Sequence, residues 1–352
     1  MAKRKGSSGE ASRRDILKLG AGAALGVAAA RAGAAAPAPA ARPAAGPWNP
    51  VTAAAMPTRN LGRTGHRVGL FSLGGQAAVE RPDNEQVAVP LVERALDLGV
   101  NYLDTSARYG GEARWSERYI GQVMKRRRAE AFLATKTHDR TREGSLRLLS
   151  RSLELLQTDH VDLWQLHAMD SMGDVERVFA KGGAIEAFEQ ARREKLVRFL
   201  GLSGHTDPEV LAEAIRRYPF DTVLMAVNAA DPHHLPFRAG LLPLAVEKEM
   251  GIIGMKIPAR GRLLAGWTPP PIEQQRGRVK ATRAGTLTMR EAMRYVLSLP
   301  VSTVIVGCDS VAQLEENVAI AREFTPLDGP QLAALERKAE PVAAQALWFR
   351  RA

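Results

Sequence analysis

The chain has 352 residues, 45% of them hydrophobic and 25% charged, which is typical of a globular protein with one large domain or two average ones. Its single cysteine, Cys308, excludes an intramolecular disulfide and any zinc or iron–sulfur site built from several cysteines. The formal net charge is +11, but residues 1–42 hold eight basic and two acidic residues (8 − 2 = +6), so the charge forms no continuous basic stripe and we expect no nucleic-acid partner.

Residues 1–42 have the features of an export signal. The segment Ser12-Arg13-Arg14-Asp15-Ile16-Leu17-Lys18 precedes a Gly- and Ala-rich apolar run, and this order resembles a bacterial twin-arginine signal. The run is shorter than the ~20 apolar residues that span a bilayer. We therefore expect the twin-arginine export machinery as a partner, membrane contact only through this segment, and a periplasmic location. The alternative is a disordered basic tail, and the location is cytoplasmic if the signal is not used.

A Pro/Ala-rich linker is predicted at residues 43–55, and regular structure is predicted beyond it. Gly62-Arg63-Thr64-Gly65 predicts a hairpin within Thr58–Val68 that closes a barrel floor. Short apolar runs predict eight strands, at Gly69–Leu73, Val100–Leu103, Ala131–Ala134, Val161–Leu166, Arg198–Leu202, Thr222–Ala226, Ile252–Met255 and Thr303–Val306. Helical patterns separate them, at Glu85–Leu98, Ser116–Arg127, Arg142–Leu156, Gly183–Glu194, Pro208–Tyr218, Leu244–Met250, Met289–Leu297 and Val311–Glu323.

The alternation of strands and helices is typical of parallel sheets. Eight strand–helix pairs in about 270 residues fit a closed barrel better than an open sheet, and no Gly-x-Gly-x-x-Gly motif follows the first strand. We therefore predict an α/β fold, a (β/α)8 TIM barrel at residues 56–325 with an N-terminal β-hairpin. A C-terminal helical extension is predicted at residues 326–352.

Four polar residues stand where successive predicted strands end. Asp104 and Tyr109 lie in NYLDTSARY, Lys136 lies in AFLATKT, and His167 ends VDLWQLH. Taken singly, each has a structural explanation, such as a solvated charge, a helix cap or a hydrogen bond to backbone. Because parallel strands of a barrel end at one mouth, however, we expect the four side chains to converge. Their joint placement favours a proton-donating site for carbonyl chemistry.

These segments resemble the aldo-keto reductase family over roughly residues 56–324. MPTRNLGRTGHRVGLFSLGG is similar to the family's hairpin and first strand, NYLDTSARYG carries its Asp and Tyr, LATKT its Lys and DLWQLH its His. VIVGCDSVAQLEEN is similar to its cofactor-phosphate segment. The resemblance implies an NAD(P)-dependent oxidoreductase, of the carbonyl reductase or alcohol dehydrogenase type, that acts on a small carbonyl substrate.

Reduction of a carbonyl group requires an acid, because negative charge grows on the oxygen as hydride reaches the carbon. Tyr109 is the expected acid, and we expect the Lys136 ammonium to lower its pKa, which is near 10 in free tyrosine. Asp104 is expected to hold Lys136 by a charge-assisted hydrogen bond, and His167 to orient the substrate oxygen. The scheme requires no metal, since a nicotinamide supplies the hydride.

The resemblance also implies a dinucleotide across the barrel mouth, NADP(H) with NAD(H) as the alternative. Gln313 stands where many members use Arg against the 2′-phosphate, so the choice stays open. Leu224 replaces the usual Gln, and Met255 lies where an aromatic residue usually stacks, so Asn228, Lys256 or Met255 could grip the nicotinamide instead. The expected cofactor-binding residues are Ser203, Asn228, Lys256, Arg260, Arg262, Ser310, Gln313, Glu316 and Asn317.

The unusual residues around the expected nicotinamide site, Leu224 and Met255, motivate a second hypothesis, in which the protein is not an enzyme. In it, the barrel is a non-catalytic NADP(H)-binding module that senses redox state. Binding of the cofactor without turnover of any carbonyl compound would distinguish it from an enzyme.

Overall fold

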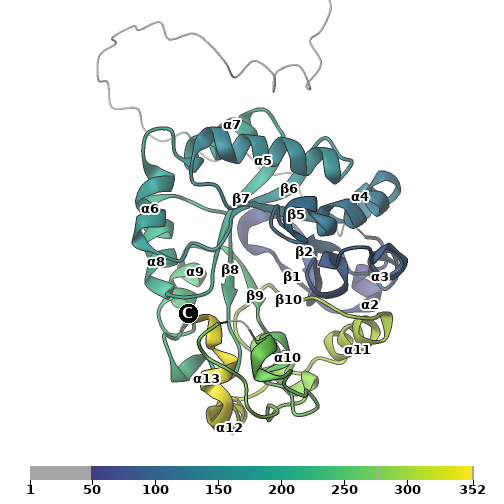
Figure 1. Ribbon diagram of the computed structural model, residues 1–352, viewed down its shortest axis with the longest axis vertical. Coiled ribbons are helices and arrows are strands. Elements are labelled where there is room, and N and C mark those ends of the chain that lie inside the picture. Colours follow the sequence, from purple (N-terminus) through teal and green to yellow (C-terminus); the bar gives the residue numbers. More distant parts are fainter. Residues whose placement is uncertain (1–48, 276, 351–352) are drawn as a thin grey trace, which may run out of the picture. The chain divides into compact units, whose positions relative to one another are not determined.

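Figure 1 shows a computed structural model of the chain, in which residues 49–275 and 277–350 are described. The predicted export signal and residues 43–48 of the predicted linker lie outside the described residues. Within the described ranges, no helix combines the length and the apolar character needed to cross a membrane.

Eight parallel strands close into a barrel in the order β10-β3-β4-β5-β6-β7-β8-β9, which confirms the predicted fold. The barrel strands are β3 (Phe71–Gly74), β4 (Tyr102–Asp104), β5 (Phe132–Thr137), β6 (Val161–Leu166), β7 (Val197–Gly204), β8 (Thr222–Ala226), β9 (Gly251–Met255) and β10 (Thr303–Val306). The predicted hairpin is also present, as antiparallel strands β1 (Thr58–Asn60) and β2 (Arg67–Gly69).

Helices surround the barrel, as Figure 1 shows. They are α2 (Thr52–Ala55), α3 (Glu85–Asp97), α4 (Trp115–Arg127), α5 (Arg142–Leu155), α6 (Met172–Phe179), α7 (Ala184–Arg193), α8 (Pro208–Arg217), α9 (Leu241–Glu247), α10 (Met289–Leu297), α11 (Val311–Arg322), α12 (Gly329–Ala339) and α13 (Ala343–Ala346).

The strand register decides which side chains meet inside the barrel. Lys136 of β5 is aligned with Gln165 of β6, and Asp104 of β4 lies opposite Ala134 of β5. Since side chains alternate between the two faces of a strand, residues two positions apart share the interior. Lower in the barrel, the Phe132 ring stacks on Tyr102 at 5.3 Å and on His66 at 4.6 Å between ring centroids. This apolar layer closes the barrel beneath the polar strand ends.

The end of the predicted linker differs from the expectation, because residues 52–55 form helix α2 rather than extended chain. Asn49 anchors this turn, since its side-chain amide donates to the Leu96 carbonyl and its side-chain oxygen accepts from Val51 N–H at 3.0 Å. Helix α2 packs on Gly99, whose φ of 82° favours glycine and where a Cβ would lie 2.7 Å from Ala55 Cβ. Proline and alanine content alone does not reveal these long-range contacts.

Two helices differ from the prediction by more than one residue at an end. Helix α6 was not expected; the Ser171 side chain caps it by accepting from Asp174 N–H, and Val175 and Val178 bury its apolar side. Helix α9 lies three residues earlier than predicted, and the left-handed φ of 51° at Glu249 prevents it from continuing.

The C-terminal extension is helical and returns to the barrel mouth. Arg350 forms an ion pair with Asp231 in which both side chains have 0% exposure. The same guanidinium donates to the carbonyls of Ala226, at the end of β8, at 2.6 Å and of His234 at 2.7 Å. It also lies 4.6 Å from the centroid of the Phe237 ring. The last described residue of the chain is therefore part of the core.

This buried pair generates a stability prediction. Substituting Arg350→Met should lower the free energy of unfolding by about 3–5 kcal/mol, because it leaves the Asp231 carboxylate buried without its partner. Urea denaturation followed by circular dichroism measures the change. The matched control is Arg290→Met, which breaks an exposed pair with Glu323 and should cost less than about 1 kcal/mol. Equal losses in the two variants would contradict the prediction.

Candidate active site

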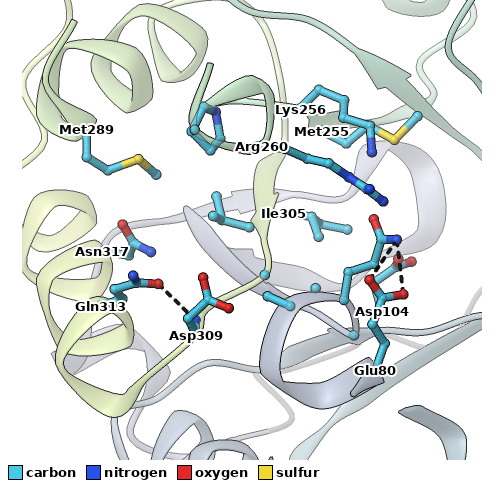
Figure 2. A pocket seen from close by; sticks show the side chains of 18 of the residues that line it. Glu80, Asp104, Met255, Lys256, Arg260, Met289, Ile305, Asp309, Gln313 and Asn317 are labelled. Carbon is cyan, nitrogen blue, oxygen red and sulfur yellow. Dashed lines mark hydrogen bonds between the residues drawn. The ribbon is translucent and has the colours of Figure 1, made fainter. Parts of the chain in front are cut away.

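A cavity of about 560 Å³ opens where the barrel strands end (Figure 2). Asp104 and Tyr109 line it, and so do Gln313 and Asn317 of α11. Figure 2 shows Asp104 and Asn317 on opposite sides of the cavity, with Ile305 of β10 between them. The cavity is therefore elongated, with a strand-β4 end and a helix-α11 end.

Asp104 and Lys136 meet at the strand-β4 end because they lie on neighbouring parallel strands. The Lys136 ammonium donates to the Asp104 carboxylate and, at 2.8 Å, to the Thr105 carbonyl. Lys136 is 1% exposed and Asp104 is 2% exposed. The Tyr109 ring lies against the amine, with 4.9 Å from Nζ to the ring centroid. The structure thus brings these three side chains together at the mouth.

The electrostatic balance at Tyr109 differs from the expected one. Burial raises the pKa of Tyr109 above its ordinary value, although the Lys136 ammonium opposes the rise. The expected lowering of this pKa is not found, because the loss of water around the phenolate outweighs the effect of the ammonium. A phenol is protonated at neutral pH even without this rise, and a raised pKa makes it a weaker acid, so the Lys136 ammonium is needed to stabilise the phenolate as the proton leaves.

The ion pair beneath Tyr109 holds its charge in spite of burial. Burial acts to lower the pKa of Lys136, but the Asp104 carboxylate and the Tyr109 phenol together raise it above its ordinary value. Burial also raises the pKa of Asp104, while Lys136 and Gln165 oppose that rise. The ammonium donates to a carboxylate and a carbonyl at once, so the geometry favours the charged pair.

The His167 ring meets the Tyr109 ring edge to face, with 5.6 Å between the centroids, and His167 is not among the residues that line the cavity. Burial, together with the charge of Lys136, lowers the pKa of His167 well below its ordinary value, so the imidazole is neutral. Its Nδ1 lies 2.9 Å from Ser106 Oγ, which also accepts from Arg108 N–H at 3.2 Å. The Ser106 hydroxyl can therefore donate a hydrogen bond to Nδ1. The neutral imidazole then has its own hydrogen on Nε2.

Three supporting residues were not foreseen from the sequence. Gln165 Nε2 donates to Asp104 Oδ1 at 3.3 Å, Ser106 contacts His167, and Arg140 donates to the His167 carbonyl at 3.0 Å. A signal for two of them was present, because Gln165 precedes His167 by two positions and Ser106 follows Asp104 by two. Period-two spacing places such pairs on one side of the chain.

Five of the expected cofactor-binding residues line the cavity: Lys256, Arg260, Gln313, Glu316 and Asn317. Lys256 and Arg260 come from the loop after β9 and have left-handed backbone, with φ of 62° and 55°. Burial, reinforced by the nearby Arg260, lowers the pKa of Lys256 to about 7. Two basic groups that face a cavity suit the pyrophosphate of a dinucleotide.

Arg262 was expected to bind the cofactor, but it is not among the residues that line the cavity. Its guanidinium donates to the carbonyls of Val279 at 3.1 Å and Gln345 at 3.3 Å, and lies 5.0 Å from the centroid of the Trp348 ring. It ties the long loop after β9 to the C-terminal extension.

Ser203, Asn228 and Ser310 also lie outside the cavity lining. Ser203 Oγ donates to the Leu166 carbonyl at 3.1 Å and accepts from Ala168 N–H at 3.1 Å. Asn228 Nδ2 donates to the Lys256 carbonyl at 3.1 Å, and Ser310 Oγ accepts from Gln313 N–H at the start of α11. Their polar groups are bonded within the protein in this structure, and their role in binding the cofactor stays a prediction.

Glycines at the end of β3 open the strand-β4 end. A Cβ at Gly75 would lie 2.4 Å from Ser116 Oγ and 2.6 Å from the Asp104 carbonyl, so no side chain fits there. The residues that follow, Gln76, Glu80 and Arg81, line the cavity and were not predicted, nor was Asp309 near its other end. Gln76 directly follows a Gly-Gly pair, a signal that the sequence contains.

Comparison with known proteins agrees with this geometry. A model of the aldo/keto reductase family matches residues 67–340. L-galactose dehydrogenase of Arabidopsis thaliana is 30% identical over 310 residues, which cover 81% of this chain and 94% of the relative.

Solved structures show the same fold. The holo form of an aldo-keto reductase from Bacillus halodurans has a TM-score of 0.65 and 26% identity, covering 81% of this chain and 96% of its own. An aldo-keto reductase from Klebsiella pneumoniae in complex with NADPH has a TM-score of 0.63 and 21% identity, covering 81% and 95%. The family uses NADP(H), in agreement with the cofactor expected from the sequence.

The contact between Ser106 and His167 generates a prediction about the imidazole. In Ser106→Ala, His167 should change from the Nε2–H tautomer to a mixture of tautomers, because Nδ1 loses its donor. Nitrogen-resolved NMR of protein with ¹⁵N-labelled histidine measures the ratio. Ser116→Ala is the control, since that hydroxyl bonds Thr105 Oγ1 at 2.7 Å. An unchanged tautomer in Ser106→Ala would show that another group fixes the ring.

Proposed function

This chain belongs to the aldo/keto reductase family, and on that basis we propose that it reduces small aldehydes or ketones to alcohols with NAD(P)H, or catalyses the reverse oxidation. The observation that carries the proposal is the Tyr109 ring packed over the Lys136 ammonium at one end of the cavity. A phenol, which is protonated at neutral pH, beside a fixed cation that stabilises its phenolate is suited to give a proton to a carbonyl oxygen.

Tyr109 donates its proton as negative charge develops on the substrate oxygen. The phenolate that remains is stabilised by the Lys136 ammonium, which Asp104 holds in place. Gln165 bonds the second oxygen of Asp104 and so fixes the carboxylate. A bound nicotinamide supplies the hydride.

His167 orients the substrate. Because its imidazole is neutral, it adds no charge that would compete with Lys136, and its Nε2–H can donate to the carbonyl oxygen. Arg140 bonds the carbonyls of His167 and Ala168, at 3.0 and 2.7 Å, and so fixes the loop after β6. The oxygen then lies between the imidazole and the Tyr109 hydroxyl.

The remaining cavity residues suit a dinucleotide. Lys256 and Arg260 would hold its pyrophosphate, and the polarizable Met255, with Leu224, would contact the nicotinamide ring. This apolar wall replaces the amide and aromatic contacts usual in the family. A nicotinamide ring bound there would contact the hydrocarbon of Leu224 and the thioether of Met255.

The central test is Tyr109→Phe. It should lower kcat for aldehyde reduction by about 10²–10⁴-fold, because it removes the proton donor and leaves the ring packing intact. Steady-state loss of reduced-nicotinamide absorbance measures kcat, and calorimetry checks that dinucleotide affinity is kept. Tyr119→Phe, whose hydroxyl accepts from Asn84 N–H on the outside of the barrel, is the matched control.

Full activity in Tyr109→Phe would refute the assigned acid. Tight dinucleotide binding with no turnover of any compound in a broad carbonyl panel would instead favour the redox-sensing module.

Lys256 generates a pH prediction. Its amine is charged below about pH 7 and neutral above, so affinity for an anionic pyrophosphate should fall as the pH rises through about 7. Calorimetric titration between pH 6 and 8 measures the dissociation constant. In Lys256→Gln the dependence should disappear.

Arg260→Gln is the informative partner variant. It should weaken binding at every pH and move the midpoint upward, because Arg260 is part of what lowers the pKa of Lys256. A pH dependence that survives in Lys256→Gln would assign the titration to a different group.

A further inference from the structure

The two ends of the cavity differ in charge, and Figure 2 shows how they are separated. Lys256 and Arg260 lie with Asp104 and Glu80 at the strand-β4 end, whereas Asp309, Gln313 and Asn317 lie at the helix-α11 end. If the proposed function holds, a nicotinamide must lie next to Tyr109. The adenosine half of the same dinucleotide then reaches the helix-α11 end.

Carboxylates line that far end. Asp309 and Glu316 both face the cavity. Among the described residues, the basic side chains that line the cavity are Arg81, Lys256 and Arg260. The last two belong to the opposite end, and Arg81 forms an ion pair with Asp309. The far end therefore has two carboxylates and one cation that is already paired.

The other donors at this end are also in use. Asp309 N–H donates to Gln313 Oε1 at 2.8 Å, and Gln313 N–H donates to Ser310 Oγ at 3.3 Å. Asn317 Nδ2 donates to the Cys308 sulfur at 3.4 Å. Two backbone N–H groups at the start of α11 are thus occupied by side chains of the protein itself.

The two dinucleotides differ in one group, the substituent on the adenosine 2′ oxygen. A 2′-phosphate adds close to two negative charges and three acceptor oxygens, which would face Asp309 and Glu316. A 2′-hydroxyl is neutral and can donate to a carboxylate, the interaction by which acidic residues recognise NAD in other folds. Juxtaposed like charges select against a ligand strongly.

We propose that this site selects NAD(H) over NADP(H), with Asp309 as the main determinant and Glu316 as the second. The far end does not fit the 2′-phosphate of the dinucleotide that the family uses. Asp309 acts twice, because its carboxylate repels the phosphate and its ion pair withdraws Arg81 from it.

Equilibrium binding tests the proposal without any turnover. Dissociation constants of NADH and NADPH are measured by calorimetry with the full chain, at 20 mM and 300 mM salt. NADH should bind at least about tenfold more tightly at low salt, and the ratio should shrink at high salt because exposed charges are screened. The fragments 5′-AMP and adenosine 2′,5′-bisphosphate, which differ only in the 2′-phosphate, should show the same order.

Substitutions at the far end locate the effect. Asp309→Asn removes the repulsion and frees Arg81, so NADPH affinity should rise about tenfold or more while NADH affinity falls slightly. Asp309→Arg should reverse the preference, and Glu316→Gln should reduce it. Glu315→Gln, one residue away and paired with Arg94 outside the cavity, makes the same charge change and should leave the ratio unchanged.

The outcomes separate the two proposals. Equal or tighter binding of NADPH by the unaltered chain overturns the selectivity and leaves the reductase assignment standing. An NADH preference that persists in the double variant Asp309→Asn/Glu316→Gln overturns the role of the carboxylates. Absence of binding by both dinucleotides overturns the proposed function itself.

Discussion

The ion pair between Lys136 and Asp104 is the constraint on which the mouth of this barrel depends. Removing two charges from water costs several kcal/mol per ion, and a pair of apolar residues would commonly be more stable at such a position. The barrel retains the charges by surrounding them with the Thr105 carbonyl and the Gln165 amide. Buried charge that stability does not require is characteristic of functional sites.

The fold holds this pair from below and from the side. Beneath it, the rings of Phe132, Tyr102 and His66 are buried and stacked on one another. Beside it, the loop after β9 presents Lys256 and Arg260 through left-handed backbone, which costs of order 1–3 kcal/mol at each residue other than glycine. Such strain persists only where the surroundings enforce it, and here Asn228 bonds the Lys256 carbonyl.

Strand periodicity made the barrel predictable, whereas the geometry of the loops could not be predicted from the sequence. The apolar runs located all eight barrel strands, and their ends located Asp104, Lys136 and His167, because alternation and polarity are local properties of the sequence. Arg262 shows the limit: its distance from Arg260 is two residues, yet one side chain faces the cavity and the other bonds the C-terminal extension. Residues brought together across the chain, such as Asn49 with Leu96, have no local signal.

The direction of the pKa shift at Tyr109 could not be predicted from the sequence for a different reason. The neighbours were identified correctly, but the amount of water removed from the phenol depends on packing that only a folded structure shows. Export is different again, since it rests on the sequence of residues 12–18 and stays a prediction that the described structure does not address.

The arrangement of charge along the cavity connects the proposed proton transfer with the proposed choice of dinucleotide. Cations from the loop after β9 lie at the strand-β4 end, and carboxylates stand at both ends, Asp104 with Glu80 and Asp309 with Glu316. At the first end the carboxylate of Asp104 is neutralised by Lys136, so it shapes proton transfer without repelling a ligand. At the second end, among the residues that the structure describes, no ion pair is found for Glu316, and Asp309 pairs with the half-exposed Arg81. Negative charge would therefore persist where the proposed adenosine ribose lies. A ligand is therefore discriminated less by its size than by the positions of its own charges. Under both proposals, the preferred ligand is a dinucleotide whose adenosine ribose has a free 2′-hydroxyl rather than a 2′-phosphate.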